Sequence, residues 1–255
     1  MGRIISFANQ KGGVGKTSTC VNLCAAVKIK RRNILLIDAD PQGNATTGMG
    51  VDKHTTPSLY DVLIRGVPAE EAIVETPYGD VIPTNINLSG ATVELVDAPE
   101  REQVLKKALE PLRDRYEYIF IDCPPSLGLL TLNALVASDA IIIPVQCEYY
   151  AMEGLADLVT SMRLTKKRFN PDLEIEGILL TMYDRRLSFS TQVALEIRKY
   201  FGKAVFSTVV PRNVRIAEAP SHGMPISAYS RMSRGATAYD CLAIEFFRHN
   251  HTMSI

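Results

Sequence analysis

Short apolar segments alternate with longer segments of helical pattern along most of the chain. The apolar segments lie at residues 4–8, 34–37, 118–121, 140–145, 175–180 and 205–210. They are apolar throughout rather than at every second position, which is typical of strands that are covered on both faces of a sheet. We therefore interpret them as the strands of a buried sheet.

The segments between these strands predict helices. The expected helices lie at residues 16–28, 101–109, 129–137, 152–169, 190–200 and 235–247. Regular alternation of strand and helix predicts an α/β fold with a single doubly wound, mostly parallel sheet and helices on both faces. The least regular part, residues 43–99, has several prolines and glycines and is expected to be a surface insertion with short helices. We expect residues 1–255 to form a single domain.

Composition removes several classes of protein. Lysine plus arginine equals aspartate plus glutamate at 28 each, so the overall charge indicates no partner. No stretch approaches the roughly 18 continuous apolar residues of a membrane span, and the N-terminus lacks the pattern of a signal peptide. The five cysteines include no CxxC pair, which argues against disulfides and zinc; Cys20 and Cys24, one helical turn apart, are expected to be buried. A reducing cytoplasm is the expected location.

The clearest chemical pattern follows the first predicted strand. Residues 9–18 read NQKGGVGKTS and lead into the first predicted helix. Gly12, Gly13 and Gly15 allow the backbone to curl so that successive N–H groups point at phosphate oxygens. The positive end of the helix dipole adds to the attraction. Strand, glycine-rich loop and helix in this order predict a phosphate-binding loop.

Two side chains complete this predicted loop. Lys16 is placed to bridge the β- and γ-phosphates, and the hydroxyl group of Thr17 can take one position around Mg²⁺. The loop departs from the usual GxxxxGK[ST] pattern, because Gln10 stands at the position of its first glycine. The physical argument is unaffected, since the remaining glycines still free the backbone.

Carboxylates follow two of the predicted strands. Residues 35–44 read LLIDADPQGN, so Asp38 and Asp40 come at the end of an apolar strand, where nucleotides bind in such folds. Asp38 could serve the metal, and Asp40 could orient or deprotonate the attacking water. Residues 118–122 read YIFID, the Walker B arrangement, in which a buried strand carries Asp122 to the Mg²⁺ side of the phosphates.

The segment KGGVGKT at residues 11–17 resembles the deviant Walker A ATPases, which include ParA, MinD and the nitrogenase iron protein. The segments 122–135, 144–155 and 210–225 look like the ParA/Soj proteins that partition bacterial chromosomes and plasmids. This resemblance implies an ATP hydrolase with slow intrinsic turnover that uses ATP and Mg²⁺. It also implies a homodimer when ATP is bound, with nonspecific double-stranded DNA and a ParB-type protein as partners.

The resemblance assigns roles to particular residues. Lys11 of one subunit is implied to reach the nucleotide of its partner and, with Lys16 and Asp40, to form the catalytic set. Pro211 and Asn213 are implied to approach the adenine. The implied nucleotide-binding residues of the loop are Lys11, Gly12, Gly13, Val14, Gly15, Lys16, Thr17 and Ser18, the last standing where many relatives have threonine. The metal residues are expected to be Thr17, Asp38 and Asp122.

Local charge agrees with DNA as the partner. Within residues 185–235 only Glu196 and Glu218 oppose the basic residues, which are Arg185, Arg186, Arg198, Lys199, Lys203, Arg212, Arg215, Arg231 and Arg234. Such a surplus would bind phosphates without reading base sequence, and salt would weaken the binding steeply. The resemblance favours Arg186 and Arg215 as the DNA contacts.

Other readings compete with DNA partitioning. A MinD-like ATPase that cycles on a membrane needs a basic amphipathic helix at the C-terminus, but residues 243–255 contain one arginine and no lysine. We expect Phe246 and Phe247 to pack in the core instead, and no membrane partner. A nitrogenase-type protein needs paired cysteines that bridge a cluster, which Cys123 and Cys147 do not suit. A DNA-bound regulator with a purely structural nucleotide remains a further alternative.

Overall fold

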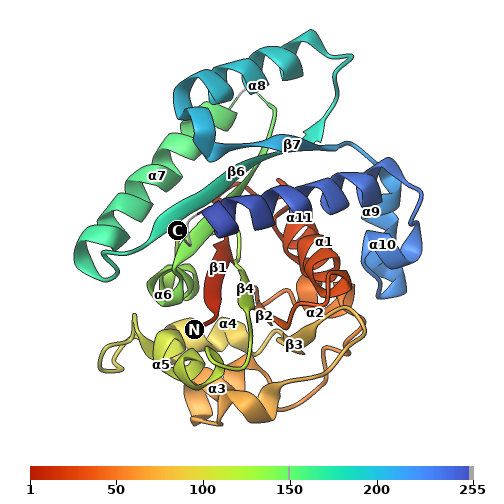
Figure 1. Ribbon diagram of the computed structural model, residues 1–255. Helices are drawn as coiled ribbons and strands as arrows, with labels where there is room; N and C mark the ends of the chain where they lie inside the picture. The colour runs from red at the N-terminus through yellow and green to blue at the C-terminus, as the bar shows by residue number, and fades with distance from the viewer. Residues whose placement is uncertain (149, 253–255) are drawn as a thin grey trace.

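The computed structural model describes residues 1–148 and 150–252, and its strands form one seven-stranded sheet (Figure 1). The strand order is β3-β2-β4-β1-β5-β6-β7, and each neighbouring pair is parallel. The strands are β1 Arg3–Phe7, β2 Ile34–Asp38, β3 Asp80–Ile82, β4 Tyr118–Asp122, β5 Ala140–Gln146, β6 Glu174–Tyr183 and β7 Val205–Pro211. The predicted doubly wound sheet is therefore confirmed.

Helices cover both faces of the sheet (Figure 1). One face packs against α1 Lys16–Ile29 and α11 Arg234–Thr252, together with the short helices α2 Asn44–Gly48, α9 Val214–Glu218, η4 Ala219–His222 and α10 Ile226–Tyr229. The other face packs against α3 Leu59–Arg65, α4 Leu88–Glu94, α5 Val104–Leu109, α6 Leu129–Ala137, α7 Ala151–Arg168 and α8 Ser188–Phe201. Three further 3₁₀ turns are η1 Ala69–Ala72, η2 Glu110–Leu112 and η3 Gly202–Ala204.

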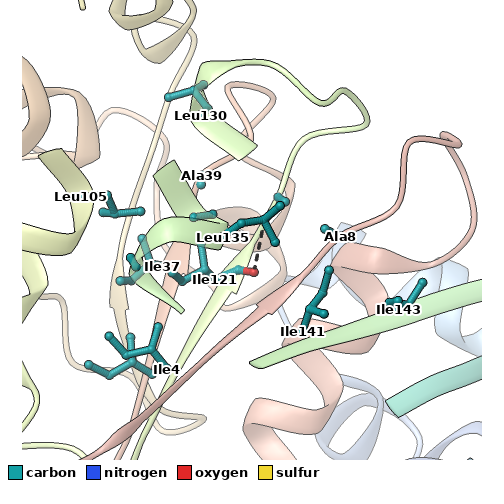
Figure 2. Close-up of a cluster of buried hydrophobic side chains, with 14 of the residues drawn as sticks. Ile4, Ala8, Ile37, Ala39, Leu105, Ile121, Leu130, Leu135, Ile141 and Ile143 are labelled. Atoms are coloured by element: carbon teal, nitrogen blue, oxygen red, sulfur yellow. Dashed lines mark hydrogen bonds between the residues drawn. The ribbon is translucent and has the colours of Figure 1, made fainter. Parts of the chain in front are cut away.

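The two faces have separate hydrophobic cores because side chains on successive residues of a strand point to opposite sides. On the face of α6, Ile37, Ile121 and Ile141 come from three different strands and are fully buried (Figure 2). On the face of α11, Phe120 meets Phe246 with ring centroids 5.9 Å apart. Phe246 is fully buried and Phe247 packs against the same core, so the predicted core role of this pair is confirmed.

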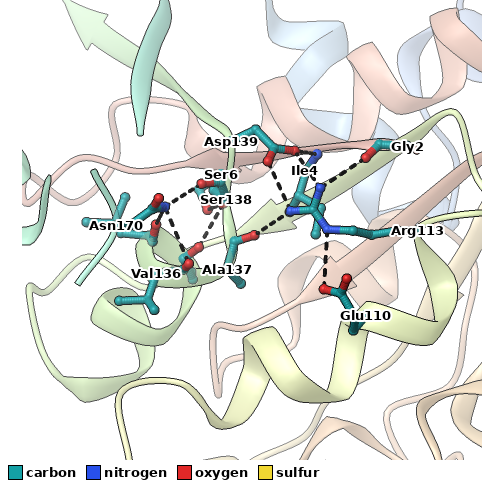
Figure 3. Close-up of polar contacts among 12 residues, drawn as sticks. Gly2, Ile4, Ser6, Glu110, Arg113, Val136, Ala137, Ser138, Asp139 and Asn170 are labelled. Atoms are coloured by element: carbon teal, nitrogen blue, oxygen red, sulfur yellow. Dashed lines mark hydrogen bonds and ion pairs between the residues drawn. The ribbon is translucent and has the colours of Figure 1, made fainter. Parts of the chain in front are cut away.

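Polar contacts fix the edge of the sheet opposite to the carboxyl ends of its strands (Figure 3). Asp139 accepts a hydrogen bond from the backbone N–H of Ile4 at 2.8 Å and forms an ion pair with Arg113 at 3.0 Å. Asn170 donates to the carbonyl group of Ser138 at 2.6 Å. These contacts tie β1, the start of β5 and the turn before β6 together.

Some predicted boundaries were wrong. The segment 43–99 contains the edge strand β3 as well as short helices, and the helix expected at 101–109 begins only at Val104. The last helix continues past residue 247 to Thr252, and residues 253–255 of the tail lie outside the described part of the chain. Within the described residues no helix is both long enough and apolar enough to cross a membrane.

Candidate functional site

The residues that the sequence singled out gather at the carboxyl edge of the sheet. In the register of the parallel strands Asp122 lies beside Phe7 of β1 on one side and beside Asp38 of β2 on the other. The loop after β1 therefore begins next to Asp122, with Asp38 one strand further along the sheet. Three segments that are far apart in the sequence meet here because parallel strands all end at the same edge.

The glycine-rich loop has the backbone conformation that its sequence predicts. Gly13 and Gly15 have φ angles of +75° and +88°, a region that residues with a Cβ atom rarely adopt. Gly15 is also the residue that precedes α1, so the first N–H groups of that helix point into the loop. A curled loop with free N–H groups and a helix N-terminus forms a cradle for phosphate.

Two side chains that the sequence analysis missed support this loop. Asn9 donates to the carbonyl oxygen of Pro144 at 2.8 Å and accepts from the backbone N–H of Lys11 at 3.1 Å. Thr181, near the end of β6, donates through its hydroxyl group to the carbonyl oxygen of Val14 at 2.7 Å. Thr181 could have been found by the signal that identified the aspartates, because it is a polar residue at the carboxyl end of an apolar strand.

Lys16 is buried at the start of α1, with 6% of its surface exposed. Its ammonium group donates to the carbonyl oxygen of Lys11 at 3.2 Å. Burial lowers the pKa of Lys16, and the negative charge of Asp122 opposes this shift. No carboxylate among the described residues is bonded to Lys16, so its buried cation is well prepared to bind an anion, which would replace the solvation that burial has removed.

The side chain of Lys11 pairs with a carboxylate of the same chain. Its ammonium group lies 2.6 Å from a carboxylate oxygen of Glu148, just after β5, and Gln146 donates to the other oxygen of that carboxylate. Both side chains of the ion pair are partly exposed, at 38% and 47%. An exposed pair of this kind contributes less than about 1 kcal/mol, so Lys11 can exchange Glu148 for another anion at little cost.

Asp122 is fully buried, and neither of its carboxylate oxygens has a hydrogen-bond partner of normal geometry among the described residues. Burial and the neighbouring charge of Asp38 raise the pKa of Asp122, while the nearby hydroxyl group of Thr17 and the charge of Lys16 lower it. A buried carboxylate without partners is costly unless a cation or donor compensates it.

Asp38 and Asp40 differ from Asp122 in their bonding. One oxygen of Asp38 accepts from both the backbone N–H and the hydroxyl group of Thr46, each at 2.7 Å, and the other accepts from the N–H of Asp40 at 3.2 Å. Burial raises the pKa of Asp38 to about 6, and the two bonds from Thr46 oppose the shift. Asp40 is 7% exposed and accepts from the N–H of Gln42 at 3.0 Å.

This bonding decides how a magnesium ion would fit. Among the described residues no three His, Cys, Asp or Glu side chains are grouped so that they could hold a metal by themselves. Mg²⁺ keeps several waters and is bound through one or two carboxylates plus substrate phosphates, so the site need not be an all-protein cage. The unpartnered oxygens of Asp122 and the hydroxyl group of Thr17 fit that requirement. The oxygens of Asp38 are already hydrogen-bonded, and its metal role stays a prediction.

The residues expected near the adenine lie at the same edge of the sheet, at the end of β7, three strands from β1. Pro211 ends β7 and lies beside Tyr183 of β6. Asn213 precedes α9 and accepts from the backbone N–H of Arg215 at 2.9 Å through its side chain. This bond fixes the orientation of the Asn213 side chain, while its role toward a base stays a prediction.

Both arginines expected to contact DNA are exposed and paired with carboxylates. Arg186 binds Asp184 with two guanidinium nitrogens, at 3.0 and 2.8 Å. Arg215 lies 2.8 Å from Glu218, which also accepts from the hydroxyl group of Tyr229. Hydrogen bonds from Arg186 lower the pKa of Asp184 to about 2, so this pair is fully charged at neutral pH. The sequence analysis counted Glu218 but missed Asp184, one residue before the basic segment.

Comparison with known proteins agrees with this geometry. A family model described as an AAA domain matches residues 2–175. The sporulation initiation inhibitor protein Soj of Bacillus subtilis is 54% identical over 248 residues, which cover 96% of this chain and 98% of that protein. The chromosome partitioning protein ParA of Myxococcus xanthus is 50% identical over 253 residues, covering 98% of this chain and 89% of that protein.

Solved structures share the fold. The structure titled cobyrinic acid a,c-diamide synthase from Mycobacterium smegmatis, with bound ADP and magnesium, superposes with a TM-score of 0.87 and 37% identity, covering 99% of this chain and 97% of that one. Relatives above 45% identity across nearly the whole of both chains, together with the loop, lysine and strand-end aspartates described above, identify the family. The chain belongs to the Soj/ParA family of chromosome-partitioning ATPases.

Proposed function

We propose that residues 1–255 act as one ATP-driven switch that binds DNA nonspecifically as a dimer and releases it after hydrolysis. The observation that carries the nucleotide half of this proposal is the buried carboxylate of Asp122. Neither of its oxygens has a hydrogen-bond partner of normal geometry among the described residues, and it lies at the end of the strand beside the glycine-rich loop. A magnesium nucleotide would supply the missing positive charge. The ADP and magnesium of the solved Mycobacterium smegmatis relative support the same choice of ligand.

The chain's own residues would share the work at the phosphates. Backbone N–H groups of Gly12 to Thr17 hold phosphate oxygens, with Ser18 nearest the α-phosphate, and Lys16 binds the β- and γ-phosphates. Thr17 and Asp122 would hold Mg²⁺, which would neutralise charge on the transferring phosphoryl group. Asp40 would orient the attacking water and accept its proton, because its carboxylate is buried at this edge and, among the described residues, accepts a hydrogen bond only from the N–H of Gln42.

Dimer formation would change the partner of Lys11. In the single chain its ammonium group is bound to Glu148. In the ATP-bound dimer Lys11 would leave Glu148 and bind the γ-phosphate of the partner subunit's nucleotide, as an arginine finger does. The exchange replaces a partly exposed carboxylate by a phosphate of higher charge, so ATP favours the dimer more than ADP does. Pro211 and Asn213 would hold the adenine.

The dimer would bind DNA through Arg186 and Arg215 of both subunits. Each arginine is exposed, so it can contact a phosphate without movement of the backbone. A ParB-type protein would accelerate the slow intrinsic hydrolysis, after which the dimer separates and the DNA is released. The ATPase would then act in the cytoplasm at the nucleoid, and its cycle of binding and hydrolysis would position a replicon.

The test is binding to a fluorescent duplex of random sequence, measured with ATP and with ADP across a salt series, for the wild type and for Arg215→Glu. We expect tight binding only with ATP, a steep loss with salt, and loss of binding in the variant. If the ATP-bound protein does not bind the duplex at low salt, DNA partitioning is excluded while the ATPase assignment stands. Sedimentation with anionic lipid vesicles would then test the MinD-like alternative.

A further inference from the structure

The glycine-rich loop contains a peptide unit that its own sequence leaves free to rotate. The carbonyl group of Val14 and the N–H of Gly15 belong to one planar peptide, and in a trans peptide these two groups point in opposite directions. Gly15 has a φ angle of +88°, but glycine adopts negative φ angles about as readily. Rotation of this peptide would exchange the directions of its carbonyl and N–H groups at little cost to the backbone. The curl of the loop therefore does not by itself fix which of the two groups faces a phosphate.

A side chain on β6 opposes this rotation. The hydroxyl group of Thr181 donates to the carbonyl oxygen of Val14 at 2.7 Å. Val14 and Thr181 are 1% and 2% exposed, so the bond is shielded from water. A Cβ atom at Gly15 would lie 3.7 Å from Cγ2 of Thr181, so the methyl group of the threonine packs against the same peptide. Without this donor the buried oxygen would lose its hydrogen bond, which is costly.

The carboxyl end of β6 is itself held in place. Thr181 lies beside Gln146 of β5, and Tyr183 lies beside Pro211 of β7. Met182 between them has a φ angle of +49°, a left-handed conformation that residues with a Cβ atom rarely adopt. Such a conformation persists where the surrounding contacts determine it, and it is found frequently at functional sites. The strand pairings on both sides therefore hold the side chain of Thr181 at one place beside the loop.

We infer that Thr181 is a positioning residue for nucleotide binding, because its bond to the carbonyl group of Val14 keeps the N–H of Gly15 directed at the phosphates. The inference rests on the part of the proposed function that places phosphates in the glycine-rich loop, and it does not depend on DNA binding. Thr181 acts through the peptide and touches no phosphate itself. A carbonyl oxygen turned toward the phosphates would repel them, so a rotated loop would have to turn back before nucleotide binds.

The first test compares two substitutions of the same residue. Thr181→Val removes the hydroxyl group and keeps the shape, whereas Thr181→Ser keeps the hydroxyl group. Titration with a fluorescent ADP analogue and Mg²⁺ measures affinity. If about one in ten valine-variant molecules has the productive peptide orientation, that variant should bind about tenfold more weakly. The serine variant should stay within about threefold of the wild type, because the hydrogen bond remains.

Thr165→Val is the matched control. Thr165 is also buried, and its hydroxyl group donates to the carbonyl oxygen of Ser161 at 3.1 Å in the last turn of α7. The substitution therefore removes a similar bond away from the glycine-rich loop, and this variant should bind ADP as tightly as the wild type. If Thr165→Val loses as much affinity as Thr181→Val, the loss reflects general stability and the inference falls.

The second test observes the peptide itself. Residues 14 and 15 are the one place in the sequence where glycine follows valine. Protein labelled with ¹³C at the valine carbonyl carbon and with ¹⁵N in glycine therefore gives a single correlated NMR signal, from this peptide. Mg²⁺ and ADP should move the Gly15 amide proton downfield in the wild type and in Thr181→Ser, as a hydrogen bond to phosphate does. In Thr181→Val the free protein should show this signal at another position or in two forms.

The outcomes separate this inference from the proposed function. If Gly15 responds to ADP in the wild type, and Thr181→Val keeps both the affinity and the signal of the wild type, Thr181 does not position the peptide and the phosphate site still stands. If ADP binds the wild type without moving the Gly15 signal, the inference and the placement of phosphate in this loop both fall. Thr181→Ala takes the place of Thr181→Val if the valine variant does not fold.

Discussion

Two regions lie at the same edge of the sheet: the phosphate side, which contains Lys16, Asp38 and Asp122, and the arginine side, which contains Arg212 and Arg234. They differ in how their side chains are held. On the phosphate side Lys16, Asp38 and Asp122 are buried, and their surroundings are fixed by strand register. On the arginine side Arg212 and Arg234 are exposed and end in solvent. Burial makes each group on the first side costly to change, whereas exposed groups act together and each contributes little. The two sides should therefore respond to substitution very differently.

The largest effect is expected for Asp40→Ala. Removing the carboxylate that would position and deprotonate water should lower the rate of ATP hydrolysis about 10²-fold or more. Binding of ATP should change by no more than about threefold, because backbone groups and Lys16 hold the phosphates. Steady-state phosphate release and titration with a fluorescent ATP analogue measure the two quantities. Equal losses in hydrolysis and in ATP affinity would show that Asp40 binds nucleotide rather than acting on water.

A smaller but still clear effect is expected for Thr46→Val. The substitution removes a hydroxyl group that donates to Asp38 and accepts from the N–H of Thr84 at 3.0 Å. Two buried polar groups would lose a partner, so the free energy of unfolding should fall by about 1–3 kcal/mol. Urea denaturation without nucleotide measures this change. Thr47→Val, half-buried one residue along, should cost less than about 0.5 kcal/mol; similar losses would mean that the bonds to Asp38 contribute nothing special.

The smallest effect is expected on the arginine side and has the opposite sign. Asp184→Asn removes the negative charge that pairs with Arg186 and leaves an uncompensated cation at this proposed DNA contact. DNA binding should tighten by about two- to fourfold at low salt, and the gain should shrink as salt rises. Asp157→Asn on α7 makes the same change of charge at a distant exposed position and serves as the control. Weaker binding in Asp184→Asn would show that the aspartate orients Arg186 for DNA.

The same contrast explains what the sequence could predict. Asp122 and Lys16 were found because each follows an apolar strand or a glycine-rich loop, and parallel strands bring such positions together. The strand β3 was missed, since three residues are too few to show a pattern. Thr46 lies in a short helix and binds Asp38 through a tertiary contact that spacing does not encode. The surplus of arginines was visible in the sequence, but their arrangement in space depends on tertiary contacts such as that of Gly235 on α11 with Ile216 on α9.

The carboxylate of Glu245 has a consequence for how copies of this protein meet one another. An edge strand with unpaired N–H and C=O groups can pair with a strand of another molecule, and such pairing leads to aggregation or fibres. Here Glu245 accepts hydrogen bonds from the N–H groups of Ser207 and Thr208 on the edge strand β7, which such pairing would need, and it places a charge beside them. Copies of the protein close together on a chromosome would then touch at β7 without pairing their strands. Assembly would depend on contacts that form when ATP binds and break when it is hydrolysed.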